Sequence, residues 1–195
     1  MAWQRFKNDR ERYSSLADDH DAFVRREYLW LTDYALFTLL KDEFGGLPWN
    51  RWPEPFALRD REAVADFIAE KRNEEEAELI FFEQFIFDRQ WRKFRSYCRD
   101  RGISLMGDVP MFVAYDSADV WANRELFDLD PQGSPNKVAG VPPDYFSTTG
   151  QRWGNPLYNW ETMRKDGFAW WKARIKKALK NFDLVRIDHF RGFSA

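Results

Sequence analysis

Residues 184–190 read LVRIDHF, a run that predicts a β-strand because apolar and charged side chains alternate along it. Val185 and Ile187 share one face of such a strand, which is apolar and suited to packing on helices. Arg186 and Asp188 share the other face and place a cation and a carboxylate near the carboxyl end. The run therefore predicts a strand with one packing face and one polar face.

The sequence before this strand predicts its partner. Residues 103–113 (ISLMGDVPMFV) form a short, mostly apolar run that predicts a second, buried strand with an acidic residue inside it. Residues 166–181 carry apolar side chains at helical spacing after Asp166, which we expect to cap a helix. The order strand, loop, helix, strand is that of a βαβ unit, so we expect two parallel neighbours. The fold class is therefore α/β.

The first half of the chain predicts helices. Apolar residues recur at helical spacing over residues 23–44, and a second helical stretch begins near Asp60, a suitable N-cap, and continues to about residue 101. Its segment 79–98 (LIFFEQFIFDRQWRKFRSYC) is apolar around much of its circumference, so we expect it to be largely buried.

A long stretch between these parts, roughly residues 114–160, is rich in Gly, Pro, Asn and Asp and is predicted to be irregular, with one short helix around residues 118–127. A loop of this length in a compact domain is usually functional or disordered. Its many aromatic rings favour the functional interpretation.

Composition limits the class of protein. The chain has 195 residues, a net charge of −2, 44% hydrophobic and 32% charged residues, which is typical of a soluble globular protein. Charges of both signs are interspersed, so we expect neither nucleic acid nor a membrane as a partner. Ten tryptophans within an aromatic share of 18% indicate either rings that face a ligand or an aromatic-rich core.

Metal and redox chemistry have no motif behind them. Cys98 is the only cysteine, and the two histidines, His20 and His189, lie far apart in sequence and match no zinc motif. We therefore expect no metal. The polar N-terminal segment and the absence of an apolar run of about eighteen residues predict a cytoplasmic protein.

Carboxylates at the strand ends are the first candidates for chemistry. In parallel α/β proteins ligands bind at the carboxyl ends of the strands, where Arg186 and Asp188 lie. A neighbouring Arg186 would lower the pKa of Asp188 and keep it ionised, as a nucleophile requires; the alternative is a structural ion pair at a strand end. Asp108 in the preceding strand is expected at the same edge, or else serves as a helix cap or turn residue.

The segment 141–160 (VPPDYFSTTGQRWGNPLYNW) mixes aromatic rings with amide and carboxylate groups, as a sugar site needs for the apolar faces and hydroxyl edges of its ligand. An aromatic-pinned loop without a ligand is the alternative. The candidate binding residues there are Asp144, Tyr145, Phe146, Gln151, Trp153, Asn155 and Tyr158.

Four stretches together resemble the amylomaltase family, the 4-α-glucanotransferases of the α-amylase clan (glycoside hydrolase family 77). The resemblance covers nearly the whole chain from about residue 20 onward, and segments 141–160 and 185–193 are its most specific parts. The stretches read FVRREYLWLTDYALFTLLKDEFGGLPWNRWP, FIFDRQWRKFRSYCRDRGISLMGDVPMFVAYDSADVW, VAGVPPDYFSTTGQRWGNPLYNW and FDLVRIDHFRGF.

The resemblance implies a (β/α)8 TIM barrel with a helical insertion. Residues 1–101 would form the mostly helical subdomain, and residues 102–195 a partial catalytic barrel with about strands three and four and the long substrate-binding loop. It also implies transfer of α-1,4-glucan segments to glucose or another glucan by a retaining double displacement, with maltooligosaccharides as partners. No cofactor is implied, because this chemistry runs on carboxylates alone.

The resemblance also implies roles for individual residues. Asp188 resembles the nucleophile, Arg186 the residue that holds and ionises it, and His189 a donor to a sugar hydroxyl. Asp108 corresponds to a substrate contact at the end of barrel strand three. The remaining implied binding residues are the lid residues Tyr145 and Phe146 and the subsite residues Asp144, Trp153 and Asn155.

One part of the family pattern has no match. A retaining glycosidase needs a second carboxylate as acid/base, about 5–5.5 Å from the nucleophile, and no carboxylate of this chain matches that motif. The opening barrel strands have no counterpart either. We therefore expect an incomplete portion of a glucanotransferase with little or no transfer activity alone; the alternatives are a non-catalytic glucan-binding remnant and an α-amylase-type hydrolase.

Overall fold

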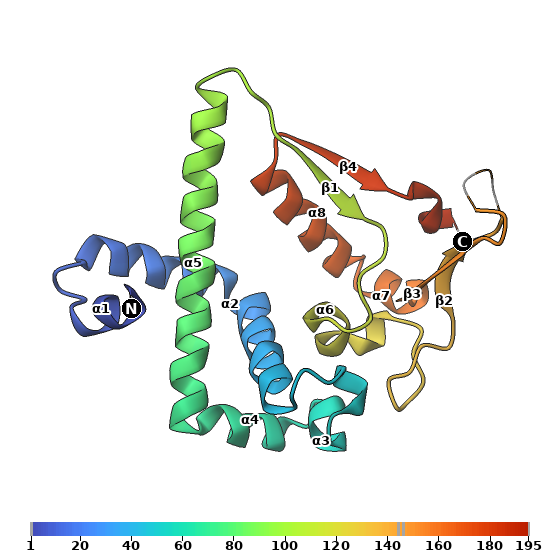
Figure 1. Ribbon diagram of the computed structural model, residues 1–195, viewed down its shortest axis with the longest axis horizontal. Helices are drawn as coiled ribbons and strands as arrows, with labels where there is room; N and C mark the ends of the chain where they lie inside the picture. The colour runs from blue at the N-terminus through green and yellow to red at the C-terminus, as the bar shows by residue number, and fades with distance from the viewer. Residues whose placement is uncertain (1, 144, 146, 195) are drawn as a thin grey trace.

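The computed structural model describes residues 2–143, 145 and 147–194, and in this part of the chain helices predominate (Figure 1). The α-helices are α1 (Ala2–Asn8), α2 (Ser14–Glu43), α3 (Glu54–Ala57), α4 (Arg61–Ala69), α5 (Lys71–Arg99), α6 (Ala118–Ala122), α7 (Trp160–Lys165) and α8 (Ala169–Asn181). The strands are β1 (Met106–Pro110), β2 (Val138–Val141), β3 (Gln151–Pro156) and β4 (Leu184–Asp188). Short 3-10 turns are η1 (Trp49–Arg51), η2 (Arg124–Leu126) and η3 (Phe190–Ser194).

The predicted parallel strand pair is confirmed. β1 and β4 form a two-stranded parallel sheet in which Asp108 lies opposite Arg186 and Pro110 opposite Asp188. Helix α8 covers one face of this sheet (Figure 1), and Val185 is half-buried there. The other face is open, and Met106 on it is 65% exposed, so the expectation of a buried first strand holds for one face only.

The helix signals of the first half also hold, with shifted ends. Helix α4 begins at the predicted cap, where the Asp60 carboxylate accepts hydrogen bonds from the backbone N–H groups of Glu62 (3.1 Å) and Ala63 (3.0 Å). Helix α2 begins nine residues before the predicted start at residue 23. Its first turns carry mostly polar residues, which hid their helical character.

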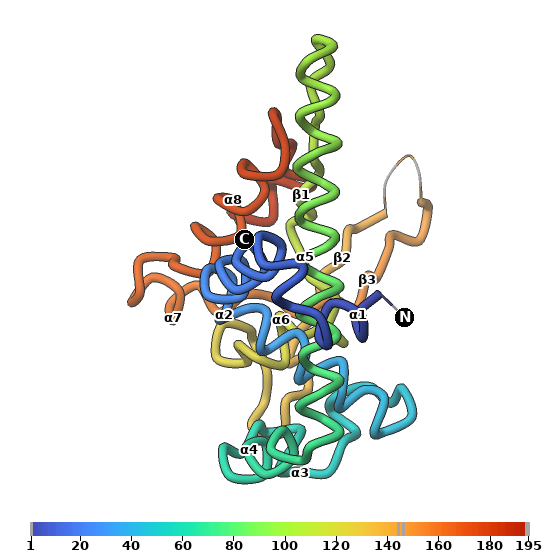
Figure 2. The backbone as a smooth tube through the Cα atoms, turned by 90° about the vertical axis from the view of Figure 1, so that its left-hand side faces the viewer, coloured from blue at the N-terminus to red at the C-terminus, as the bar shows by residue number. Residues whose placement is uncertain are grey.

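Helix α5 corrects one expectation. Segment 79–98 is not largely buried: Phe87 is 60%, Phe94 49% and Tyr97 53% exposed, while Phe82 and Phe85 are buried. The helix, a long rod in Figure 2, packs against α2, α4 and α8, and its exposed rings show that the rest of its circumference is open. An apolar circumference indicates what a helix can bury, and the packing partners decide how much of it is buried.

Glu27 ties the helical half to α8. This residue of α2 is 7% exposed, and its carboxylate accepts hydrogen bonds from Lys177 Nζ (2.8 Å) and Lys180 Nζ (3.1 Å) of α8 and from Trp30 Nε1 (2.7 Å). Burial alone would raise the pKa of Glu27, but these donors together with Arg26 hold it well below its ordinary range. The anion is therefore a fixed anchor between the two helices.

The region predicted to be irregular contains more structure than expected. Within residues 114–160, β2 and β3 form an antiparallel hairpin with a register shift, which the sequence did not predict. The predicted short helix around residues 118–127 is present as α6 followed by η2. In Figure 1 the hairpin lies on the same side of α5 as the β1–β4 pair.

One hydrophobic core joins both halves of the chain. It includes Leu40 and Trp49 from the first half and Val109, Trp121 and Trp171 from the second. Trp49 and Trp121 are fully buried, so part of the aromatic richness belongs to the core. The division into a helical subdomain and a partial barrel at residue 101 stays a prediction.

Candidate active site at the carboxyl ends of β1 and β4

The open face of the β1–β4 pair carries a charged pair. Arg186 donates from Nε to Asp108 Oδ1 at 2.6 Å and from Nη2 to Asp108 Oδ2. Both side chains are more than half exposed. The hydrogen bonds from Arg186 hold the pKa of Asp108 below its ordinary range, and the same pair raises the pKa of Arg186. The cross-strand register, which puts these two residues opposite each other, creates the pair.

The hydrogen-bonded partner of Arg186 is thus Asp108 on the neighbouring strand. In the part of the chain that the structure describes, no hydrogen bond or ion pair joins Arg186 to Asp188, although the two charges interact electrostatically, so the role of Arg186 in keeping Asp188 ionised stays a prediction. Asp108 lies inside β1, so it is not a helix cap. Asp188, the exposed last residue of β4, keeps its carboxylate open toward solvent.

His189 follows Asp188 in a left-handed backbone conformation, with φ of 51°. Non-glycine residues adopt this conformation at a cost in free energy, and such residues gather at functional sites. The His189 ring lies edge-on to the Trp153 ring, with centroids 5.0 Å apart and planes at 83°. The chain reversal after β4 therefore brings the imidazole to the β2–β3 hairpin.

The hairpin supplies two of the predicted binding residues. Trp153 is 38% exposed, and its Nε1 donates to Gln151 Oε1 at 2.9 Å. Asn155 donates from Nδ2 to the backbone carbonyl of Val113 at 2.7 Å, which fastens the hairpin to the segment after β1. The structure thus brings Trp153, Asn155 and His189 together with the carboxyl ends of both strands.

The loop at the tip of the hairpin holds the other candidates. Tyr145 is 96% exposed. Asp144 and Phe146 lie outside the described residues, so the proposed lid stays a prediction.

Tyr158 was a candidate binding residue, but the structure places it in the core. It is 6% exposed, its hydroxyl donates to the Met111 carbonyl at 2.7 Å, and burial raises its pKa to about 12. For this ring the alternative of an aromatic-rich core is correct.

Phe112 is the residue at this site that the sequence did not single out. Its ring contacts the rings of Trp153, Tyr158 and His189. A phenylalanine two residues after a strand was visible in GDVPMFV, but nothing in the sequence indicated which rings it would meet.

The site offers an exposed carboxylate, a guanidinium held by a second carboxylate, and aromatic surface beside an imidazole. In the described residues no group of three or more His, Cys, Asp or Glu side chains is arranged to hold a metal ion. Among the same residues, no helix has the length and apolar character needed to cross a bilayer.

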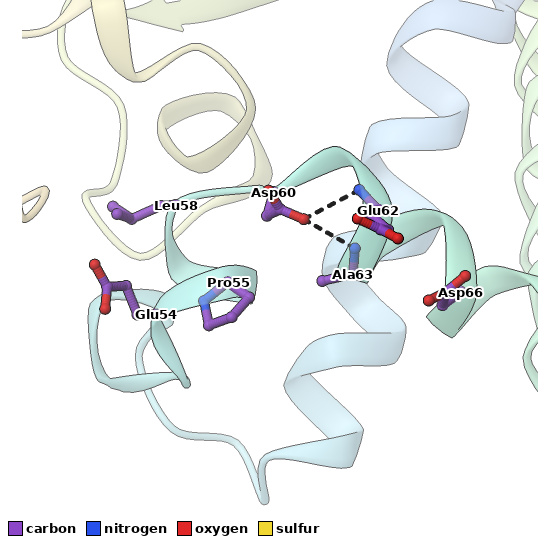
Figure 3. Close-up of a pocket in the computed structure, with 7 residues that line it drawn as sticks. All are labelled: Glu54, Pro55, Leu58, Asp60, Glu62, Ala63 and Asp66. Atoms are coloured by element: carbon purple, nitrogen blue, oxygen red, sulfur yellow. Dashed lines mark hydrogen bonds between the residues drawn. The ribbon is translucent and has the colours of Figure 1, made fainter.

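A separate pocket of about 550 Å³ lies between α3 and α4 (Figure 3). Its acidic residues are Glu54, Asp60, Glu62 and Asp66, and Asp60 is occupied as the cap of α4. It lies away from the β1–β4 pair (Figure 1) and has no cation in its lining, so we assign it no role in the site.

Comparison with known proteins identifies the family of the chain. Residues 1–195 match the family model described as 4-alpha-glucanotransferase, glycoside hydrolase family 77. The 4-alpha-glucanotransferase of Thermus thermophilus is 54% identical over 174 residues, 89% of this chain and 34% of that protein. That of Aquifex aeolicus (strain VF5) is 49% identical over 192 residues, 97% of this chain and 38% of that protein.

A solved structure gives the same result. The amylomaltase from Streptococcus agalactiae in complex with acarbose superposes with a TM-score of 0.88 at 37% identity, over 98% of this chain and 38% of that chain. The chain thus spans about a third of the length of the curated relatives named above. It belongs to the 4-alpha-glucanotransferase family, glycoside hydrolase family 77.

Proposed function

We propose that this chain supplies the nucleophile strand and part of the substrate cleft of a 4-α-glucanotransferase acting on α-1,4-glucans. The observation that carries the proposal is the placement of an open carboxylate, Asp188, at the end of β4, beside the Asp108–Arg186 pair and the Trp153–His189 contact. Membership of the family supports it.

The chemistry follows from these positions. The Asp188 carboxylate attacks the anomeric carbon, the glycosidic bond breaks, and a covalent glucosyl-enzyme forms; a sugar hydroxyl then displaces Asp188 with overall retention. Arg186 contributes positive charge beside the nucleophile, His189 donates a hydrogen bond to a sugar hydroxyl, and Trp153 offers a ring for an apolar sugar face. Asp108 orients Arg186 and lies within reach of substrate.

Two parts of the complete enzyme are assigned outside these residues. The acid/base carboxylate, which protonates the leaving oxygen and then takes the proton of the attacking sugar hydroxyl, has no candidate here. We also propose that β1 and β4 are neighbouring strands of a (β/α)8 barrel whose other strands belong to the two thirds of the relatives' length that this chain does not span. A cytoplasmic location stays a prediction.

A segment graft tests the function. The matched 174-residue segment of the Thermus thermophilus relative is replaced by the corresponding residues of this chain, and release of glucose from maltotriose is measured. We expect the graft to disproportionate maltotriose and the 195-residue chain alone to show little or no transfer. A folded graft without transfer would contradict the proposal, and robust transfer by the isolated chain would contradict the assignment of the acid/base outside it.

The same graft separates the alternatives. Added glucose should divert the products toward longer glucans in a transferase and leave the products of a hydrolase unchanged. A graft whose products do not respond to glucose therefore points to an α-amylase-type hydrolase. A graft that binds maltooligosaccharides without any turnover points to a glucan-binding remnant.

A further inference from the structure

Phe112 occupies the point where three segments of the site meet. It lies two residues after β1, and its ring is stacked on Tyr158 with centroids 6.1 Å apart and planes at 13°. The same ring contacts Trp153 of β3 (6.3 Å) and His189 after β4 (6.1 Å). One side chain therefore links the carboxyl end of β1, the hairpin and the carboxyl end of β4.

The backbone around Phe112 is fixed from two sides. The Tyr158 hydroxyl holds the carbonyl of the neighbouring Met111, which is 1% exposed. A Cβ at Gly192 would lie 2.7 Å from Met111 Cγ and 3.3 Å from Phe112 Cζ, so a glycine is needed for η3 to approach this closely. The Phe112 ring thus has supporting contacts in addition to the one with His189.

His189 depends on such a support. Its left-handed backbone conformation is unfavourable for a residue with a Cβ and persists only where neighbouring contacts favour it. Locally, its carbonyl accepts a hydrogen bond from Gly192 N–H at 2.9 Å. Its ring contacts Phe112 and Trp153, and aromatic pairs of this kind prefer edge-on and tilted arrangements such as these.

We propose that Phe112 is a positioning residue of this site: its ring holds the His189 imidazole edge-on to Trp153. The positioning itself rests on the contacts described above. Its purpose, which is to keep the imidazole oriented toward a bound sugar, rests on the proposed function. Phe112 acts through His189 and Trp153 and is not itself a catalytic residue.

The 195-residue chain allows a direct test because it contains only two histidines, His20 and His189. Their side-chain NMR signals are recorded with nuclear Overhauser contacts to assigned aromatic protons. His20 is an internal control, since it lies in a remote cluster with its ring 5.4 Å from those of Phe6 and Phe85. In the unmodified chain we expect His189 contacts to both Phe112 and Trp153, and their absence would overturn the proposal without any variant.

The variants then separate positioning from general packing. In Phe112→Leu, and in Phe112→Met as a second variant of similar volume, we expect loss of the His189–Trp153 contact and a shift of the His189 signals, with His20 unchanged. Phe112→Tyr, which keeps the ring, should restore both. A retained His189–Trp153 contact in the Leu and Met variants, or equal shifts at His20 and His189, would overturn the proposal.

Addition of maltotriose to the NMR sample tests sugar binding near His189 separately from the positioning of its ring. If maltotriose moves the His189 signals of the unmodified chain and moves them less in Phe112→Leu, then the ring positions a sugar-binding imidazole. If maltotriose moves nothing while the variants still uncouple His189 from Trp153, the positioning holds and sugar binding by the isolated chain is overturned, while the graft tests the proposed function separately.

Discussion

The two ends of the β1–β4 pair use the same residue types for different purposes. At the amino end, Asp183 precedes β4 and accepts hydrogen bonds from Arg95 Nη2 (2.8 Å), Arg99 Nε (2.9 Å) and the backbone N–H of Leu105 (3.0 Å). Its side chain is 15% exposed. At the carboxyl end, Asp188 is exposed, and two residues before it Arg186 pairs with Asp108, whose side chain is 51% exposed.

The difference lies in how many elements each carboxylate joins. Asp183 connects α5, the segment before β1 and the start of β4, and these donors, first among them Leu105 N–H, hold its pKa far below the ordinary range. The Asp108–Arg186 pair joins only the two strands. A many-partner carboxylate with little exposure stabilises the fold, whereas exposed charges at the strand ends remain available to a ligand.

Removal of the carboxylate at the carboxyl end of β4 should have the strongest effect on transfer activity. In the graft, Asp188→Asn should lower transfer from maltotriose on the order of 10⁴-fold, because the nucleophile is removed. The matched variant Asp183→Asn should retain transfer per folded molecule. Comparable losses of kcat in the two folded variants would show that the two ends are not functionally distinct.

At the amino end, Gly107→Ala should cost about 1–3 kcal/mol of unfolding free energy through overpacking. A Cβ at this position would lie 2.2 Å from Cδ2 of Phe182, the residue that precedes Asp183. Urea unfolding of the 195-residue chain measures the cost. Adding Phe182→Leu should recover part of it, and a Gly107→Ala variant as stable as the parent would contradict the close packing.

The pH dependence of stability sharpens the account of Asp183. Because its folded-state pKa lies below the unfolded value of about 3.9, its contribution is fully present above that value and is lost as pH falls. The stability gap between the chain and Asp183→Asn should be constant above about pH 5 and shrink below about pH 4. A difference in stability that does not change with pH would mean that the charge of Asp183 does not contribute to stability.

The smallest effect is expected for Asp108→Asn. The pair with Arg186 is exposed, and exposed ion pairs contribute little to stability. The urea midpoint should stay close to that of the parent chain, whereas in the graft the substrate affinity should fall. Marked destabilisation would show that this pair stabilises the fold, as Asp183 and its donors do.

Sequence patterns predicted β1 and β4, their parallel order and the polar face of β4, because alternation and the βαβ order are local properties. They did not predict the partner of Arg186. Residues two apart on one strand share a face, but the residue opposite on the neighbouring strand is closer, and the register that puts Asp108 there cannot be inferred from either strand alone.

Two further misses have similar causes. Helix α5 was expected to be largely buried because its composition shows how much apolar surface it has, while its exposure depends on neighbours far away in sequence. The β2–β3 hairpin lies in a stretch rich in Gly and Pro, residues that indicate turns and loops, so no strand was expected there. The contact between Phe112 and His189 could not be predicted either, because it joins residues that are far apart in sequence.

The central claim is that Asp188 becomes covalently bonded to glucose. A fluorinated glucosyl donor that forms the intermediate faster than it is released is added to the graft, and the digested protein is analysed by mass spectrometry. We predict a glucosyl adduct on the peptide that contains Asp188 and none in Asp188→Asn. An adduct on a different carboxylate in a graft that still transfers glucan would contradict the account.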